Sequence, residues 1–272
     1  MRKICSFAIS LLALSASVLA APNMQQITTT SWHGLSGLYV IPTARMIGKN
    51  NLAVGFNESK HTEFIRNGKF VDRQIRGVLT YGATDWLEIA ATYYNNMYMI
   101  PPDREPQLHN ETFHTFDLKA RLMKEDPHYW FPEVSIGVRD IFDNTADAGP
   151  LHDVNNGMKG FIVVSKRLLK DPCTGRFMDV HLGATLDKNV FAGFAGFELT
   201  LAPNASLIVE AIYDSPYLNF RSFGSENEQG RFLFNPGIRI YPELVPGMAL
   251  YLGFIGDSEF EFSFGISYKM RM

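Results

Sequence analysis

The chain has 272 residues and a formal net charge of −3, and hydrophobic residues make up 46% of it. This charge balance gives no basic surface for nucleic acid, so nucleic-acid binding is excluded as a function class. The mean hydropathy of −0.06 is typical of a soluble protein. A membrane β-barrel passes the same test, because alternating strands dilute its hydropathy.

The first 20 residues have the three regions of a secretory signal peptide. Arg2 and Lys3 precede the apolar run 4–20, and small residues follow as far as Ala21. We predict that residues 1–20 are removed on export. A buried core helix is the alternative, but no partner helix follows. Cys5 would leave with the peptide, so Cys173 would be the single cysteine of the mature chain and no internal disulfide could form.

Residues 21–50 carry a motif rich in turn-forming residues, made of Gly34, Gly37, Pro42, Thr43, Ala44 and Arg45. Glycine allows tight turns and close approach, and proline interrupts regular strand pairing. We interpret this segment as a plug inside a barrel, with Arg45 facing an acidic residue of the lumen. A disordered periplasmic tether and an extra strand are the alternatives.

From residue 51 onward the sequence repeats a strand-like pattern. Twelve strands are expected at 51–60, 70–81, 86–95, 113–124, 130–141, 157–168, 178–187, 190–202, 205–215, 230–241, 248–256 and 259–271. Most have lengths near the nine to eleven residues with which a tilted strand crosses a bilayer. Residues 51–272 are therefore expected to form the barrel.

Alternation with a period of two gives most strands one apolar and one polar face. In strand 259–271, Phe262 and every second residue on either side of it are apolar, while Glu261 and Lys269 belong to the alternate, polar set. Leu118 and Leu182 likewise belong to the apolar faces of strands 113–124 and 178–187. In a barrel these faces would contact lipid. Two strands blur the pattern, 157–168 and 205–215, the second through Ile208 and Ile212.

The connections alternate as well. Short turns, mostly with proline, alternate with a set that contains the long polar stretches 60–69, 96–112, 140–156 and 216–229. Aromatic residues gather near strand ends, including Trp86, Trp130, Tyr93 and Tyr94. Short turns on one side and two aromatic girdles are typical of outer-membrane barrels. We predict an all-β, antiparallel transmembrane barrel of about twelve strands with both termini periplasmic. The alternative is a soluble double-layered sandwich.

Charged residues of both signs occupy the parity that would face the lumen. They are Arg76, Glu88, Asp117, Lys119, Arg121, Glu133, Arg139, Lys166, Glu198, Glu210, Arg239, Glu261 and Lys269. Unpaired charges in a confined interior are costly, so one interpretation is a network of ion pairs that makes the barrel rigid. The other is a polar wall for a hydrated polymer or a small solute. Neither sign dominates, so strong ion selectivity is not expected.

Catalytic and metal-binding patterns are weak. His114 and His181 lie on opposite parities of separate strands, and no Gly-x-Ser-x-Gly elbow occurs. Asp140, Asp143, Asp147 and Asp153 lack the spacing of a calcium loop. We predict no catalytic site, no metal and no cofactor.

Several blocks of the sequence resemble the YjbH-type outer-membrane family, which is associated with bacterial exopolysaccharide production. The blocks are GLSGLYVIPTARMIGKNNLAVGF (34–56), DLKARLMKE (117–125), VSIGVRDIF (134–142), VVSKRL (163–168), AGFELTLAPNASLIVEAIYD (195–214) and PGIRIY (236–241). They keep the family's order and cover most of the mature chain. Many members are much longer, so this chain corresponds to a single barrel-sized unit.

The resemblance implies an accessory role in exopolysaccharide or capsule biosynthesis or export, as a passive conduit or an assembly factor in the outer membrane. Expected partners are outer-membrane lipid, the barrel-assembly machinery, the polysaccharide itself and periplasmic polysaccharide-export proteins. An outer-membrane lipid-modifying enzyme and a non-transporting structural surface barrel are the alternatives.

Overall fold

The computed structural model describes residues 29–31, 34–65, 68–100, 107–126, 130–142, 158–171, 176–187, 190–213, 232–255 and 261–272. The predicted signal peptide lies outside these residues, and so do Asp143, Asp147, Asp153 and Cys173. In the described part of the chain, no helix has the length and apolar character needed to span a membrane.

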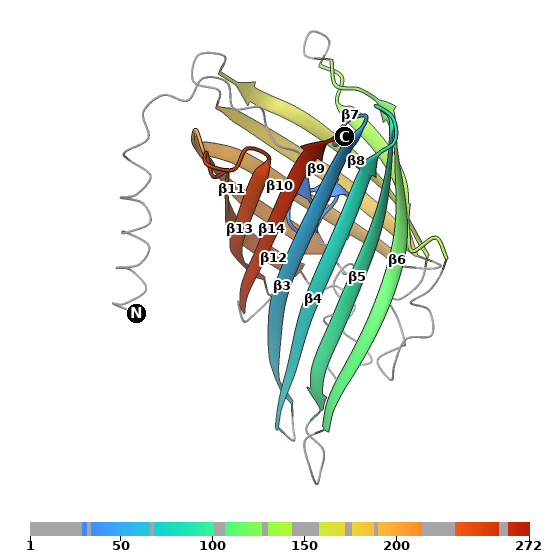
Figure 1. Cartoon of the computed structure of the whole chain (residues 1–272), viewed down its shortest axis with the longest axis vertical. Coiled ribbons are helices and arrows are strands. Elements are labelled where there is room, and N and C mark those ends of the chain that lie inside the picture. Colours follow the sequence, from blue (N-terminus) through green and yellow to red (C-terminus); the bar gives the residue numbers. More distant parts are fainter. Residues whose placement is uncertain are drawn as a thin grey trace.

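Twelve antiparallel strands close into one barrel, as Figure 1 shows. They are β3 (Asn51–Ile65), β4 (Gly68–Gly82), β5 (Leu87–Ile100), β6 (Gln107–Met123), β7 (Glu133–Arg139), β8 (Lys159–Lys170), β9 (Phe177–Asp187), β10 (Val190–Ala202), β11 (Ala205–Tyr213), β12 (Phe232–Ile240), β13 (Met248–Ile255) and β14 (Glu261–Arg271). Neighbours in sequence pair with each other, and β14 pairs with β3 to complete the ring. The predicted antiparallel barrel is confirmed.

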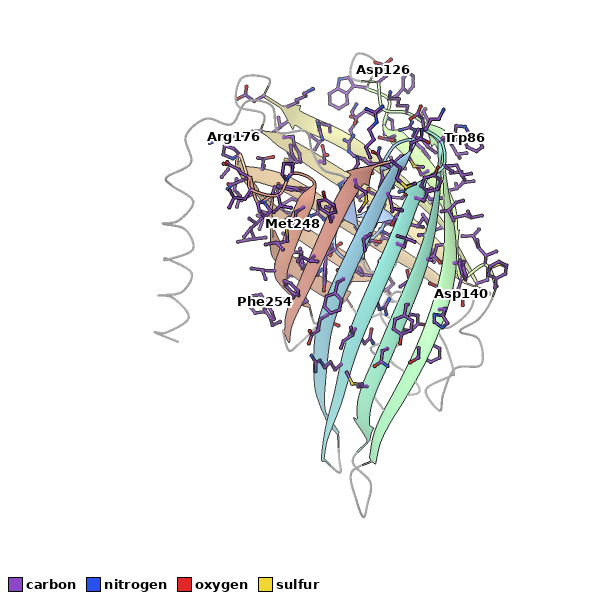
Figure 2. All side chains as sticks on the ribbon, in the orientation of Figure 1. Trp86, Asp126, Asp140, Arg176, Met248 and Phe254 are labelled. Carbon is purple, nitrogen blue, oxygen red and sulfur yellow. The ribbon has the colours of Figure 1, made fainter. Side chains whose placement is uncertain are left out.

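The wall has an apolar outer face and a polar inner face. Leu118, Leu182 and Phe262 are 36%, 56% and 56% exposed, and Phe254, labelled in Figure 2, is 50% exposed. Lys119, next to Leu118 in sequence, is fully buried. A soluble sandwich would bury the first set and expose the second. The observed order is the reverse, as expected of strands surrounded by lipid.

Strands β3 to β6 are longer than the sequence suggests, and in Figure 1 they extend beyond the strands on the opposite side. The prediction of loops at 60–69 and 96–112 was wrong over most of their length. Pairing continues to Ile65 opposite Gly68 and to Ile100 opposite Gln107. Backbone hydrogen bonds carry the ladder onward where the regular apolar alternation that marks a membrane-crossing strand has ended.

The N-terminal segment folds inside the barrel. A two-stranded sheet pairs β1 (Thr29–Thr30) with β2 (Ser36–Gly37), and Gly37 also bridges to Pro42. Gly34 has a φ of +101°, which allows the turn before β2. We call residues 34–47 the plug. Figure 1 shows this blue segment within the outline of the strands.

One expected girdle residue points the other way. Tyr94 lies on the inner face of β5, is 5% exposed and stacks under the guanidinium of Arg76, 4.7 Å from its ring centroid. Its outward neighbour Tyr93 is 49% exposed. Two consecutive strand residues face opposite sides of the sheet, so only one of them can belong to an external girdle.

Candidate functional site

The plug buries an apolar core against one part of the inner wall. From the plug, Leu38, Val40 and Ile41 are at most 1% exposed. They belong to a cluster whose wall members include Phe161, Val163, Phe194, Ile208, Ile212 and Tyr251. These residues explain the strands that are apolar on both parities. One face is directed outward, and the other packs on the plug.

Glu210 on β11 holds the central turn of the plug. Its Oε1 atom accepts hydrogen bonds from three successive backbone N–H groups, those of Tyr39 (3.0 Å), Val40 (2.9 Å) and Ile41 (3.0 Å). The other oxygen accepts from the amide of Asn235. Successive N–H groups that converge in this way form an anion-binding concavity. Here the anion is supplied by the barrel wall.

A second attachment joins the two ends of the plug. Glu88 and Lys119 form a fully buried ion pair of 2.9 Å between β5 and β6. Nζ of Lys119 also donates to the carbonyl oxygens of Ser36 (3.2 Å), Thr43 (3.1 Å) and Arg45 (2.8 Å). Glu88 accepts from the backbone N–H of Ser36 (3.2 Å) and from that of Ile47. The pair is costly to bury alone, and the plug backbone supplies the bonds that compensate for it.

Arg45 anchors the plug near the end of the barrel that carries the short turns. It contacts Asp179 (3.1 Å), Glu125 (2.9 Å) and Glu133 (3.7 Å). Burial opposes the charge of the guanidinium, but the three carboxylates outweigh this and raise the pKa of Arg45. Asp179 also binds Arg167, at 2.7 Å. The expected acidic partner of Arg45 is thus a group of three.

Hydroxyl groups of the wall pair with the backbone of Ala44. Ser135 donates to its carbonyl oxygen and Ser165 accepts from its N–H, both at 2.8 Å. Ser165 also lies 2.7 Å from Nδ1 of His181. Ser165 and His181 are at most 1% exposed. A serine and a histidine do meet here, but beneath the plug and away from solvent.

Tyr39 and Arg239 complete the contacts. Tyr39 stacks on Tyr251 with ring centroids 3.9 Å apart, and burial raises the pKa of Tyr39 well above its usual value. Arg239 pairs with Glu198 at 3.1 Å, and its guanidinium lies 3.4 Å from the carbonyl oxygen of Gly37. The remaining space beside Tyr39 is about 10 Å³, close to what one water molecule needs.

The residues predicted to line the lumen lie on the inward parity where the structure describes their side chains, with one exception. The prediction for Lys166 was wrong: Ser165 faces inward, so Lys166, the next residue of β8 and the partner of Val180, faces outward. Six of the inward-facing residues are at most 4% exposed and contact the plug either directly or through one intervening side chain. They are Glu88, Lys119, Glu133, Glu198, Glu210 and Arg239. The side chain of Glu261 lies outside the described part.

The other predicted lumen residues are linked less closely to the plug. Asp117 pairs with Arg139 at 4.0 Å and Arg121 with Glu133 at 2.9 Å. From the outward parity, Lys166 reaches Glu125 at 3.2 Å. Arg76 bonds Gln74. Lys269 is partly buried.

Sequence reasoning missed the uncharged and accessory residues of the site. Ser36, Tyr39, Ser135, Ser165, Asn235 and Asp179 all bond across the plug interface or support it. Asp179 had a usable signal, because it shares the inward parity of His181. The hydroxyl and amide groups had none, since such residues are common on any wet strand face.

The described residues do not assemble a metal site, and the two histidines considered in the sequence lie apart. No group of three or more His, Cys, Asp or Glu side chains in the described ranges could hold a metal ion. His114 is exposed on the outer face of β6, whereas His181 is buried inside β9. The two histidines therefore lie on opposite sides of the wall.

One family model matches part of the chain. A model described as exopolysaccharide biosynthesis protein YbjH, of the YjbH family, matches residues 29–145. The chain is similar to the YjbH family. The predicted resemblance is confirmed over this stretch, which contains the whole plug and strands β3 to β7. No curated protein sequence matches the chain significantly.

Solved outer-membrane barrels resemble the structure weakly. The transport unit of the autotransporter AIDA-I from Escherichia coli has a TM-score of 0.48 and 10% identity over 97% of this chain and 96% of that one. The COG4313 outer membrane channel from Pseudomonas putida F1 has 0.46 and 11% over 82% and 95%. Omp33 from Acinetobacter baumannii has 0.41 and 10% over 82% and 98%. Similarities this weak carry no information about function.

Proposed function

We propose that this protein is a closed outer-membrane barrel that acts as a non-catalytic assembly factor in exopolysaccharide biosynthesis or export. The family similarity over residues 29–145 supports the exopolysaccharide role. The apolar outer face supports a membrane location. The observation that carries the closed state is the plug, which occupies the lumen and bonds Glu88, Lys119 and Glu210 from its own backbone.

A closed lumen favours an assembly role over a passive conduit. Polar groups that would bind sugar hydroxyls in an open channel are already bonded to residues 36–47. The Ser165–His181 pair is covered by Ala44, which argues against a lipid-modifying enzyme that uses it. In this role the outer loops and the periplasmic turns, rather than the lumen, would contact the polysaccharide-export proteins.

A first experiment tests the exopolysaccharide role. Deleting the gene in its host should lower the amount of secreted polysaccharide, and expression of the full chain should restore it. The same amount of polysaccharide in the deletion strain would contradict the proposal. The deletion strain should otherwise retain its outer-membrane proteins, which can be checked on gels of isolated membranes.

A second experiment separates the assembly factor from a gated conduit. A Cβ atom at Gly196 would lie 2.6 Å from Cδ1 of Leu38, so Leu38→Cys with Gly196→Cys is the pair to test for a disulfide between the plug and β10. Cys173→Ser removes the competing thiol. We expect the oxidised, locked variant to support polysaccharide production as well as its reduced form. Loss of production on oxidation and recovery on reduction would indicate a plug that must open.

A further inference from the structure

The outer face of the barrel has a recess of about 500 Å³ across β4, β5 and β6. Two cross-strand rows form it. Gly77, Tyr93 and His114 are paired neighbours in one row, and Leu79, Ala91 and Phe116 in the other. The recess exists because Gly77 has no side chain and Ala91 has a short one. A Cβ atom at Gly77 would meet nothing within 4 Å.

The recess opens at the edge of the apolar band, on the side of the long loops. On β6, outward residues run from Leu122 to His114, eight residues away, which is about 20 Å of depth for a strand tilted by about 40°. The apolar band of such barrels is about 25 Å tall. The next outward pair, Asn95 and Thr112, is hydrogen-bonded at 3.2 Å. Polar surface therefore begins just beyond Tyr93 and His114.

Two polar rings stand at this rim above an apolar floor. Tyr93 and His114 are both exposed, with ring centroids 5.2 Å apart. Amphipathic rings are common at this level of a membrane barrel, and here two of them stand side by side over the recess. The floor is made of Leu79, Ala91 and Phe116.

We propose that this recess binds one membrane lipid with an anionic phosphate headgroup. An acyl chain lies over Gly77 against Leu79 and Phe116. The phenol of Tyr93 and the imidazole of His114 donate hydrogen bonds to phosphate oxygens. The size is within the roughly 300–1,000 Å³ of small-molecule sites. This goes beyond the proposed function and requires only that the barrel lies in a membrane.

The test compares two glycines of the outer face. Gly160 on β8 also faces outward, and a Cβ atom there would meet nothing within 4 Å, so Gly77→Leu and Gly160→Leu should both fold. Heat-modifiable gel migration checks this. The purified full chain in detergent is then titrated with phosphatidylglycerol or with phosphatidylcholine of the same acyl chains, and bound lipid is counted by native mass spectrometry.

We expect the wild type and Gly160→Leu to retain one phosphatidylglycerol per barrel. Gly77→Leu fills the space of the acyl chain and should weaken this binding by about tenfold or more. His114→Ala should remove the preference for phosphatidylglycerol over phosphatidylcholine. The proposal is overturned if Gly77→Leu binds phosphatidylglycerol as the wild type does, if the wild type shows no headgroup preference, or if Gly77→Leu instead abolishes a dimer of the wild type.

Discussion

The two faces of the barrel wall follow different rules although they are made by the same strands. On β9, Leu182 faces out and is 56% exposed, while the adjacent His181 faces in and is 1% exposed. The outer residues need only be apolar, because a fluid hydrocarbon adapts to any shape. The inner residues must match one folded segment atom by atom. Burial within protein therefore falls on the polar face, the reverse of a soluble β-protein.

The inner face also differs within itself. Its apolar members, such as Phe194, Ile208 and Ile212, lie against the hydrophobic residues of the plug. Its charged members, such as Glu88, Lys119 and Glu210, bond to the plug backbone. Deviations from simple alternation therefore mark where the plug binds. Substitutions on both faces test whether contact with the plug determines which residues occupy the inner face.

Removing Glu210 should have the largest effect. Glu210→Ala leaves three backbone N–H groups of the plug without their acceptor inside a dry interior, and this should lower the free energy of unfolding by about 3–5 kcal/mol. The temperature at which the barrel band is lost on unboiled gels measures the loss. Glu243→Ala, on an exposed turn, is the control. Equal temperatures for the two variants would mean that the hydrogen bonds from the plug to Glu210 contribute nothing.

The Glu88–Lys119 pair should show strong coupling. Lys119→Met leaves Glu88 charged and buried, a loss of about 3–5 kcal/mol. Adding Glu88→Gln removes that charge, so the double variant should lose less than the sum of the single variants. Unfolding in urea gives the three values. Strict additivity would show that the two side chains do not interact.

A charge on the outer face tests whether that face must be apolar. Leu182→Arg should cost about 2–4 kcal/mol if this position lies near the middle of a bilayer. The same substitution at Leu244, which is 96% exposed on a turn, should be nearly neutral. Folding yields into lipid vesicles provide the comparison. Tolerance of arginine at Leu182 would mean that water, and not lipid, surrounds that face.

The close approach of the plug to β10 predicts a smaller effect. Gly196→Leu would collide with Leu38 and Ile41, which lie 2.6 Å and 2.7 Å from the added Cβ atom, and such overpacking costs about 1–3 kcal/mol. Gly160→Leu, in open space, should cost nothing. If both variants unfold at the same denaturant concentration, the plug does not pack on β10.

The smallest effect is expected at Arg45. Its side chain is 17% exposed, and Asp179 keeps Arg167 as a partner. Arg45→Gln should cost about 1 kcal/mol, reduced further by salt because the contacts are partly screened. Because the pKa of Arg45 is raised, the contribution of Arg45 itself should not fall between pH 7 and pH 10. Loss of that contribution by pH 9 would mean that Arg45 does not stabilise the plug through these ion pairs.

The wall could be predicted from the sequence to a large extent. A period of two leaves a direct trace in strands such as 259–271, and lipid imposes no other requirement on Phe262 or Leu182. The ends of β3 to β6 could not be predicted this way, because the regular apolar alternation stops at about Arg73 while the backbone ladder continues.

The candidate site was predictable only as a set of inward charges. Parity places Glu210 and Lys119 inside, but it does not reveal that Glu210 accepts from the turn at 39–41 or that Lys119 joins Ser36 to Arg45. Those contacts join residues far apart in the chain, and they depend on how the plug turns after Gly37. The side of the wall that a strand residue faces can be predicted from its neighbours in sequence, whereas the path of the plug cannot.

The central claim is that residues 34–47 fill the lumen, and the accessibility of Val40 tests it most directly. Val40 is fully buried and Leu244 is 96% exposed. In a Cys173→Ser background, each is replaced by cysteine, Val40→Cys or Leu244→Cys, and the folded barrel is treated with a membrane-impermeant maleimide. We predict rapid labelling at residue 244 and labelling at residue 40 only after boiling in detergent. Equally rapid labelling of residue 40 in the folded barrel would contradict the closed lumen.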